Sequence, residues 1–338
     1  MIPVLIAGLI AMVAAVVTGP KFIAVLRARN LGQQIRAEGP ATHMVKQGTP
    51  TMGGLLIIAS AIIPFLAVSQ YTAEGLTVLF IVLGCALIGF TDDYLKIRRR
   101  HSLGLPGRWK MAGLVVVTIG AALLLSGSTT FTTDVYVPVA GWTLDLSFGY
   151  YVLLFLVIGG TVNGANLTDG IDGLAAGTVV IMLLTFLAIA GIAWLRSGDP
   201  GARSDTLLDI ATLAAALIGG TIGFLWYNAF PAEVNMGDTG SFALGGAIAG
   251  FAIVTGTEIL LPLIAGIFVI EVLSLIIQVI SFKRTGKRVF LMAPIHHHFE
   301  MKAWSETKIM VRFWVICAIF CASGFSLFYR DFLQFAQP

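Results

Sequence analysis

Charged residues are scarce in this chain of 338 residues. Asp, Glu, Lys and Arg make up 12% of it, against roughly 25% in an ordinary soluble domain, whereas 57% of the residues are hydrophobic. So low a charge content excludes a soluble globular domain. Instead, long apolar runs dominate the chain, and they cover residues 2–25, 51–69, 76–91, 111–127, 149–163, 174–195, 207–227, 242–256, 259–281 and 309–328.

These runs are near the roughly 20 residues that a helix needs to cross a bilayer. Only helices and closed barrels can cross, because unpaired backbone groups are costly in lipid, and the runs are too long and continuous for barrel strands. We therefore expect an all-α, polytopic membrane bundle of about ten transmembrane helices, formed by a single integral-membrane domain over residues 1–338. Pro262 is expected to kink the run 259–281.

The chain has only three cysteines, and it has no basic segment before its first apolar run. Cys85, Cys317 and Cys321 all lie inside apolar runs without metal-site spacing, so we expect them to be packing residues. A cleavable signal peptide has basic residues before its apolar core, whereas the first basic residue here, Lys21, comes only near the end of the first run. We expect that run to remain as a helix.

Basic residues are missing from the loops at 70–75 and 128–148. Eighteen of the 21 Lys and Arg residues lie in or beside the segments 21–46, 96–110 and 283–312. Loops rich in Lys and Arg stay in the cytoplasm. The distribution therefore predicts that both termini are outside and that these three segments are cytoplasmic.

Three acidic clusters follow apolar runs on the predicted cytoplasmic side: Asp92-Asp93, Asp169 with Asp172, and Asp238. Adjacent carboxylates repel each other unless a cation lies between them, and Mg²⁺ usually takes one or two carboxylates together with substrate phosphate. If Lys96 continues the helix of Asp92 and Asp93, all three share a face. The alternative is a solvated helix end with an intrahelical ion pair.

Two glycine-rich stretches surround the later acids. Asn166-Leu-Thr-Asp-Gly-Ile-Asp-Gly173 and Met236-Gly-Asp-Thr-Gly-Ser241 combine acids, amides and hydroxyls with glycines that permit close backbone approach. Thr239, Ser241 and the following helix N-terminus could hold an anion. The alternative for both stretches is ordinary helix capping.

The run His296-His297-His298 does not favour zinc, because three consecutive histidines fit tetrahedral geometry poorly and no cysteine supports them. Contacts to phosphate or acid–base chemistry near neutral pH fit better, with surface polarity as the alternative. Lys46 precedes a Gly- and Pro-punctuated turn, a weak signal for phosphate binding. Glu271 lies within an apolar run, where an acid is a functional candidate unless it is near an interface.

In this order, the stretches resemble the bacterial phospho-N-acetylmuramoyl-pentapeptide-transferase family, the muramyl branch of the polyprenyl-phosphate N-acetylhexosamine-1-phosphate transferases. The resemblance covers nearly the whole chain, and the His segment favours the muramyl branch. The motifs that carry it are Gly48-Thr-Pro-Thr-Met-Gly-Gly54, Asp92-Asp-Tyr-Leu-Lys96, Asn166-Leu-Thr-Asp-Gly-Ile-Asp-Gly173, Met236-Gly-Asp-Thr-Gly-Ser241, Pro294-Ile-His-His-His-Phe-Glu300 and Trp304-Ser-Glu-Thr307.

The resemblance implies a homodimeric, Mg²⁺-dependent enzyme of the bacterial cytoplasmic membrane, with its site on the cytoplasmic side. It would transfer phospho-MurNAc-pentapeptide from UDP-MurNAc-pentapeptide to undecaprenyl phosphate, giving lipid I and UMP in the first membrane step of peptidoglycan synthesis. Membrane lipid is a further expected partner, and nucleic acid is not.

Carried onto this sequence, the family pattern implies catalytic residues Asp92, Asp93, Asp238 and His297, with Mg²⁺ held by Asp238 and Asp93. The substrate-binding residues that it implies are Lys46, Thr51, Lys96, Asn166, Asp169, Asp172, Asn228, Asn235, Gly237, His296 and His298. One position departs from the pattern, because the residue before Met236 is often a Phe that would stack on uracil, and here it is Asn235. Stacking at that position is therefore in doubt.

Several alternatives stay open at this level. The lipid phosphate attacks directly, helped by Asp92 as a base or orienting group, or a covalent phosphoryl-aspartate forms in two displacements. A sibling transferase would use UDP-GlcNAc as the donor. A secondary transporter is the alternative from another class, but transporters place polar sites near the midplane, often within inverted repeats. Here the acids cluster at one face and the sequence has no visible repeat.

Overall fold

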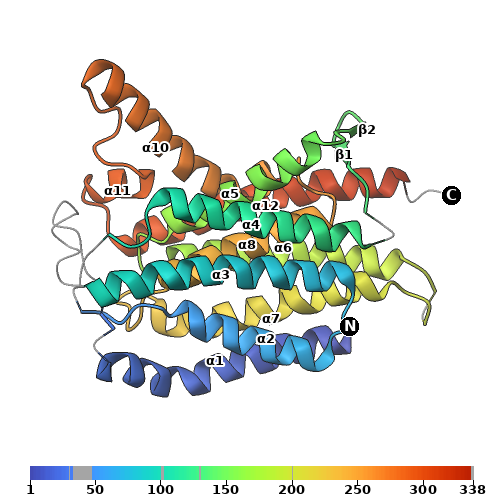
Figure 1. Ribbon diagram of the computed structural model, residues 1–338, viewed down its shortest axis with the longest axis horizontal. Coiled ribbons are helices and arrows are strands. Elements are labelled where there is room, and N and C mark those ends of the chain that lie inside the picture. The colour runs from blue at the N-terminus through green and yellow to red at the C-terminus, as the bar shows by residue number, and fades with distance from the viewer. Residues whose placement is uncertain (30, 33–47, 100–102, 129–130, 200, 336–338) are drawn as a thin grey trace.

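The computed structural model describes residues 1–29, 31–32, 48–99, 103–128, 131–199 and 201–335. Nearly all of the regular structure in these ranges is helical (Figure 1). The elements are α1 Ile2–Ala28, α2 Gly54–Val68, α3 Ala73–Arg99, α4 Gly107–Ser126, β1 Asp134–Val137, β2 Trp142–Asp145, α5 Gly149–Thr168, α6 Leu174–Arg196, α7 Asp205–Asn228, α8 Gly237–Val254, α9 Leu261–Ile264, α10 Gly266–Thr285, α11 Ile295–Glu300 and α12 Glu306–Phe335.

Nine of the described helices are long and apolar enough to cross a membrane, and they are α1, α3, α4, α5, α6, α7, α8, α10 and α12. The chain is therefore a multi-pass membrane protein, as its composition predicts. The run 51–69 gives only the 15-residue α2, about 22 Å long at 1.5 Å per residue. Its first residues instead form an irregular, buried segment from Pro50 to Gly53, which is tolerated at membrane depth only where protein surrounds it.

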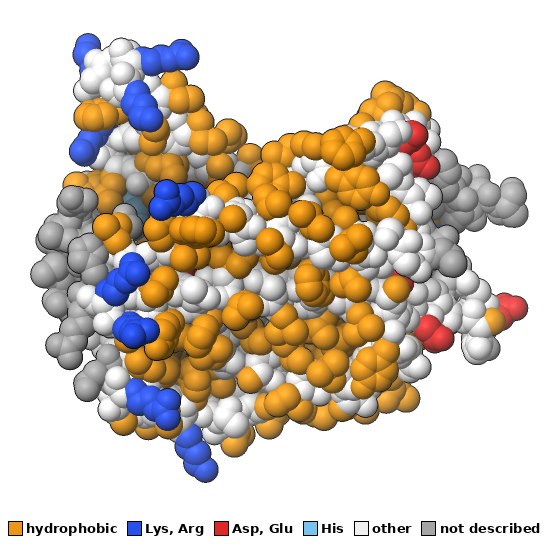
Figure 2. Space-filling model, in the orientation of Figure 1, with side chains coloured by type: hydrophobic (Ala, Val, Ile, Leu, Met, Phe, Trp, Pro, Cys, Tyr) orange, Lys and Arg blue, Asp and Glu red, His pale blue; other side chains and the backbone are white. Residues whose placement is uncertain are grey.

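Charge divides the two ends of the bundle. Lys and Arg gather at one end of the face in Figure 2, the visible Asp and Glu side chains lie at the opposite end, and apolar side chains cover the middle. The N-terminus and the C-terminal end of α12 lie at the end opposite the Lys and Arg residues (Figures 1 and 2). This arrangement is the one expected when two polar membrane surfaces flank a hydrocarbon layer.

Helix α8 lies at the centre, packed against α3 and α5, and its residues from Asp238 to Ile253 are all buried. Glycines make this packing close. A Cβ at Gly89 of α3 would collide with the Asp238 carbonyl group, and a Cβ at Gly245 of α8 would collide with α5 at Val162. Small residues let helix backbones approach each other in membranes, and here they bring the start of α8 against the end of α3.

Two segments differ from the sequence-based expectation. The run 259–281 is divided into the four-residue α9, which contains Pro262, and the separate helix α10, so the chain breaks there instead of bending. Helix α10 then leans away from the bundle in Figure 1 and leads to α11. The loop 128–148 also contains a small antiparallel hairpin, in which Asp134 of β1 faces Asp145 of β2.

Candidate active site

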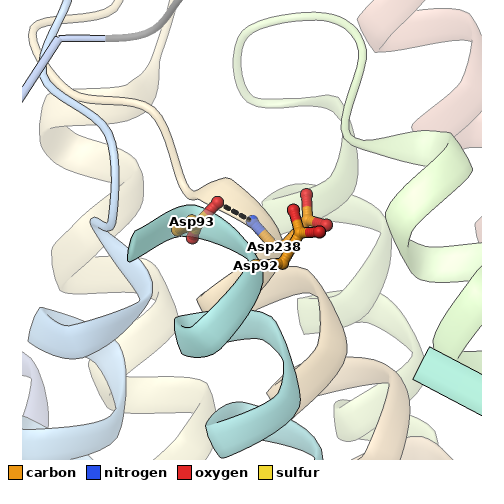
Figure 3. A group of neighbouring side chains, drawn as sticks. All are labelled: Asp92, Asp93 and Asp238. Atoms are coloured by element: carbon orange, nitrogen blue, oxygen red, sulfur yellow. Dashed lines mark hydrogen bonds between the residues drawn. The ribbon is translucent and has the colours of Figure 1, made fainter. Parts of the chain in front are cut away.

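Three carboxylates meet at the end of the bundle that carries the Lys and Arg residues. Asp92 and Asp93 lie near the C-terminal end of α3, and Asp238 lies in the first turn of α8. One carboxylate oxygen from each lies within 4.8 Å of the other two, and all three residues are buried. The close packing of α3 on α8 produces this cluster, because the two helices contribute residues far apart in the sequence (Figure 3).

Two ammonium groups neutralise most of this charge. Lys96 Nζ lies 2.5 Å from Asp92 Oδ2 and 3.0 Å from Asp238 Oδ1. Lys110 Nζ, from the first turns of α4, lies 3.0 Å from Asp92 Oδ1 and 2.6 Å from Asp238 Oδ2. Buried charges require such partners. Three carboxylates and two ammonium groups leave one net negative charge, so the cluster attracts a cation while its lysines can meet an anion.

Asp92 and Asp238 face the same side in Figure 3, whereas the Asp93 carboxylate points toward the start of α8. The oxygens of Asp93 accept hydrogen bonds from the backbone N–H groups of Asp238 and Thr239. Carboxylate oxygens are the ligands that Mg²⁺ prefers, and those of Asp92 and Asp238 already contact cationic ammonium groups. The donor set of Asp92, Asp93 and Asp238 therefore fits a divalent cation.

Asn166 extends the cluster toward α5. Its side-chain amide donates to Asp238 Oδ1 and to Ser241 Oγ, each at 3.1 Å. Lys110 Nζ also lies 5.2 Å from the centre of the Phe242 ring. Opposite these groups, the Leu105 N–H donates to Asp92 Oδ1 at 2.7 Å, so the loop after α3 covers Asp92, which is only 1% exposed.

Thr51 and Gly237 lie against each other on the other side of Asp93. Gly237 has φ +74°, a conformation that favours glycine, and a Cβ there would meet Asp93 Oδ2 and Thr51 Oγ1. The Gly53 N–H donates to the Asn235 carbonyl, and the Asn235 N–H donates to the Pro50 carbonyl. These bonds fix the irregular segment before α2 to the segment before α8.

Asp169 and Asp172 follow α5. Burial, followed by the charges of Asp238, Asp93 and Asp172, raises the pKa of the Asp169 carboxyl well above its ordinary value. Asp172 Oδ2 accepts the Ala232 N–H at 3.0 Å, so the α5–α6 loop contacts the segment that leads to α8. The structure therefore brings this predicted pair to the edge of the acid cluster.

Asn228 is 3% exposed. Its side chain accepts the Gly173 N–H at 3.0 Å and donates to the Val234 carbonyl at 2.9 Å. Both bonds hold loops together, so the structure gives Asn228 a structural role beside its predicted substrate contact.

A cavity of about 620 Å³ opens next to Asp172 and Asn235. Phe230 and Trp304 contribute aromatic rings to its wall, and Glu300 and Glu306 contribute carboxylates. The Trp304 ring is already stacked on Phe299, with centroids 4.6 Å apart, and Arg312 lies 4.3 Å from its centroid. The cavity therefore joins two of the predicted substrate-binding residues to the segment that precedes α12.

The three histidines differ from one another. His296 is fully buried, and its Nδ1 lies 3.0 Å from Glu271 Oε1 of α10, so the buried acid has a partner in the predicted His segment. His297 Nδ1 lies 2.5 Å from Glu300 Oε2. His298 Nδ1 accepts the Leu291 N–H at 3.1 Å, and burial, helped by Lys302, lowers its pKa.

Lys110 is the site residue that the sequence reasoning missed. It was counted only among the basic residues that set the topology, and a lone Lys at a helix start gives no further signal.

Lys46 lies outside the described residues. The other predicted residues fall into three groups around the cluster: Asp92, Asp93, Lys96, Asn166 and Asp238 within it, Thr51, Asp169, Asp172, Asn228, Asn235 and Gly237 in the adjoining loops, and His296, His297 and His298 on α11.

Comparison with known proteins agrees with the motifs. Residues 75–256 match the family model described as glycosyl transferase family 4, and residues 46–58 match phospho-N-acetylmuramoyl-pentapeptide-transferase signature 1. Proteins named phospho-N-acetylmuramoyl-pentapeptide-transferase are similar over nearly their whole length. The one from Frankia alni is 43% identical, with 98% of each chain covered. Those from Rubrobacter xylanophilus and Shouchella clausii are 44% and 46% identical, covering 97% and 92% of this chain and 98% and 93% of theirs.

Proposed function

Because the chain belongs to the phospho-N-acetylmuramoyl-pentapeptide-transferase family, we propose that it transfers phospho-MurNAc-pentapeptide from UDP-MurNAc-pentapeptide to undecaprenyl phosphate. The products are lipid I and UMP. The observation that carries the proposal is the buried cluster of three carboxylates and two lysines at one end of a membrane bundle. A phosphoryl transfer between a soluble and a lipid substrate requires charge stabilisation at such a place.

The reaction is assisted by Mg²⁺, for which Asp238 is the principal protein ligand. The ion supplies neutralisation of the charge on the diphosphate and on the departing UMP. Lys96 and Lys110 contribute ammonium groups that reduce the repulsion between the two phosphate-bearing substrates. Support comes from the donor set, since the same oxygens of Asp92 and Asp238 that would face a metal already contact these lysines.

The chemical step is a direct displacement. An oxygen of the lipid phosphate forms a bond to the sugar-linked phosphorus of the donor, the bond from that phosphorus to UMP breaks, and Asp92 accepts or orients the proton of the attacking phosphate. The burial of Asp92 beneath Leu105 keeps bulk water from the group. Trapping a labelled acyl-phosphate on Asp92 or Asp93 would refute the direct route in favour of the covalent one.

The donor binds along the loops that adjoin the cluster. Asn166, Asp169 and Asp172 face its sugar-phosphate part, and the cavity next to Asp172 and Asn235 takes part of the nucleoside. The histidines of α11 complete the phosphate end. The hydrocarbon of the acceptor remains in the membrane, where the apolar surface of the bundle meets lipid (Figure 2).

The enzyme is a single-domain, homodimeric protein of the bacterial cytoplasmic membrane, with its site in the cytoplasm and both termini outside. The orientation follows from the positive-inside rule, and the position of the N-terminus and of the end of α12 opposite the Lys and Arg residues supports it. Two termini on the same side require an even number of passes, so α2 counts as the tenth crossing beside the nine longer helices of the described residues.

The test is UMP release by purified protein in detergent, with undecaprenyl phosphate and UDP-MurNAc-pentapeptide, with and without Mg²⁺, for the wild type and Asp238→Asn. We expect release that requires the lipid and Mg²⁺ and that falls at least a hundredfold in the variant, the loss typical of a group that stabilises transition-state charge. Release of UMP from UDP-GlcNAc but not from UDP-MurNAc-pentapeptide would assign the protein to the sibling branch. Folded protein that releases UMP from neither donor would refute the proposal and favour a transporter.

A further inference from the structure

The Asp93 carboxylate points away from the other two acids and toward the start of α8 (Figure 3). One oxygen accepts the Asp238 N–H at 3.1 Å. The other accepts the Thr239 N–H at 2.9 Å and the Thr239 hydroxyl at 2.7 Å. Asp93 is 3% exposed and Thr239 is fully buried, so these three bonds are shielded from water.

These bonds provide acceptors for the N–H groups at the start of α8. The first N–H groups of a helix have no partner within the helix, and Met236, the N-cap residue of α8, provides no side-chain hydrogen bond. A carboxylate is favoured at this place because the helix dipole leaves positive charge at the N-terminus. Asp93 of α3 therefore caps α8 from a neighbouring helix.

The surrounding packing leaves the start of α8 little freedom. Gly89 permits α3 to touch the Asp238 backbone, and Gly237 adopts the positive φ that turns the chain into α8 beside Asp93. The backbone N–H that binds Asp93 belongs to Asp238 itself. The bond that caps the helix thus also fixes the direction in which the Asp238 side chain leaves the backbone.

We propose that Asp93 is a positioning residue, which acts on the reaction through α8 by holding Asp238 against Lys96 and Lys110. The family pattern assigns Asp93 to the metal and to catalysis, but in this chain its oxygens are engaged by the helix that carries Asp238. The inference rests on the proposed function for its kinetic consequences only. Its structural part, that the Asp93–Thr239 bond sets the cation affinity of Asp238, holds independently.

Thr239 offers a test that leaves every charge in place. Thr239→Val removes one donor to Asp93 and keeps the size of the side chain, whereas Thr239→Ser keeps the hydroxyl. Thr221→Val is the matched control, because Thr221 is equally buried and its hydroxyl donates to the Leu217 carbonyl within its own helix α7. The readouts are the affinity for Mn²⁺, by electron paramagnetic resonance without substrate, and kcat and KM for UMP release.

We expect Thr239→Val to weaken Mn²⁺ binding and to lower kcat about tenfold, the lower end of the effect of one hydrogen bond to a charged group, with KM changed less than twofold. Thr239→Ser and Thr221→Val should stay within twofold of the wild type. In an Asp93→Asn background, Thr239→Val should have a smaller effect, because the hydroxyl that it removes would then face a neutral amide instead of a carboxylate. If the Asp93→Asn protein does not fold, the comparison of Thr239→Val with Thr239→Ser decides alone.

The proposal is overturned if Thr239→Val leaves Mn²⁺ affinity and kcat unchanged, or if its effect multiplies with that of Asp93→Asn. Either result would mean that Asp93 acts directly on the metal or substrate. A wild-type protein that releases no UMP would refute the proposed function instead. In that case the Mn²⁺ measurements still test the role of Asp93.

Discussion

Lys110 of α4 contacts the acid cluster, whose carboxylates lie on α3 and α8. Its removal tests how the charge of this cluster is balanced. Its Nζ lies 2.6 Å from Asp238 and 3.0 Å from Asp92, and the side chain is 21% exposed. Lys110→Met keeps most of the length of the side chain but deletes the charge. The net charge of the cluster then falls from one negative to two negative, with Lys96 as the remaining counterion.

Deleting the Lys110 charge should strengthen cation binding but slow turnover. A unit charge at 4 Å interacts by about 4 kcal/mol at an effective dielectric of about 20. Because Lys110 is partly solvated, even a third of this value corresponds to roughly tenfold tighter cation binding. Turnover should fall about 10²–10³-fold, as when one donor to developing charge is removed. Leaving two buried carboxylates with one counterion should also lower stability by about 1–2 kcal/mol, less than the 3–5 kcal/mol of a fully buried pair.

The assay pairs Mn²⁺ titration without substrate with the kcat of UMP release. Lys283→Met is the control, since it deletes an exposed lysine at the tip of α10 and should change neither value more than twofold. Lys110→Arg keeps the charge and should leave Mn²⁺ affinity near that of the wild type. The reasoning is refuted if Lys110→Met weakens Mn²⁺ binding together with kcat, or lowers kcat less than threefold.

Two further predictions concern buried polar residues. Asn228→Ala should lower the free energy of unfolding by about 2–4 kcal/mol, because two buried loop bonds lose their partner. Asn163→Ala, which removes one bond within α5, should lose less than about 1 kcal/mol, and equal thermal unfolding midpoints would contradict this. Burial raises the pKa of Glu258, which accepts the Tyr150 hydroxyl at 2.8 Å. A raised folded-state pKa makes ionisation destabilising, so wild type should lose stability relative to Glu258→Gln as pH rises through that pKa. Their midpoints should differ more at pH 8 than at pH 4, and a constant difference would exclude the effect.

Local arrangements were largely predictable. The spacing of Lys96 after Asp92 and Asp93 predicts a shared helix face, and the ammonium group indeed lies 2.5 Å from one acid and 3.9 Å from the other. Pro262 was expected to kink the run 259–281, whereas the structure divides the run at Ala265, between the four-residue α9 that contains Pro262 and the separate helix α10. Glu271 was singled out as a functional candidate because it lies within an apolar run, but its contact with His296 joins two segments that no local pattern connects.

Hydropathy, the positions of Lys and Arg, and ordered motifs are properties of the chain itself, and they determined by themselves the helical membrane class and the family. The tertiary structure alone decided which helix ends meet. Lys110 and Asp238 lie 128 positions apart, and no periodicity links them. They meet because α3 packs against both helices: Gly89 of α3 lies against the Asp238 backbone of α8, and Gly113 of α4 lies against Ile88 of α3. That packing also turns Asp93 toward the N-terminus of α8, since the unpaired N–H groups of a buried helix end must find an acceptor.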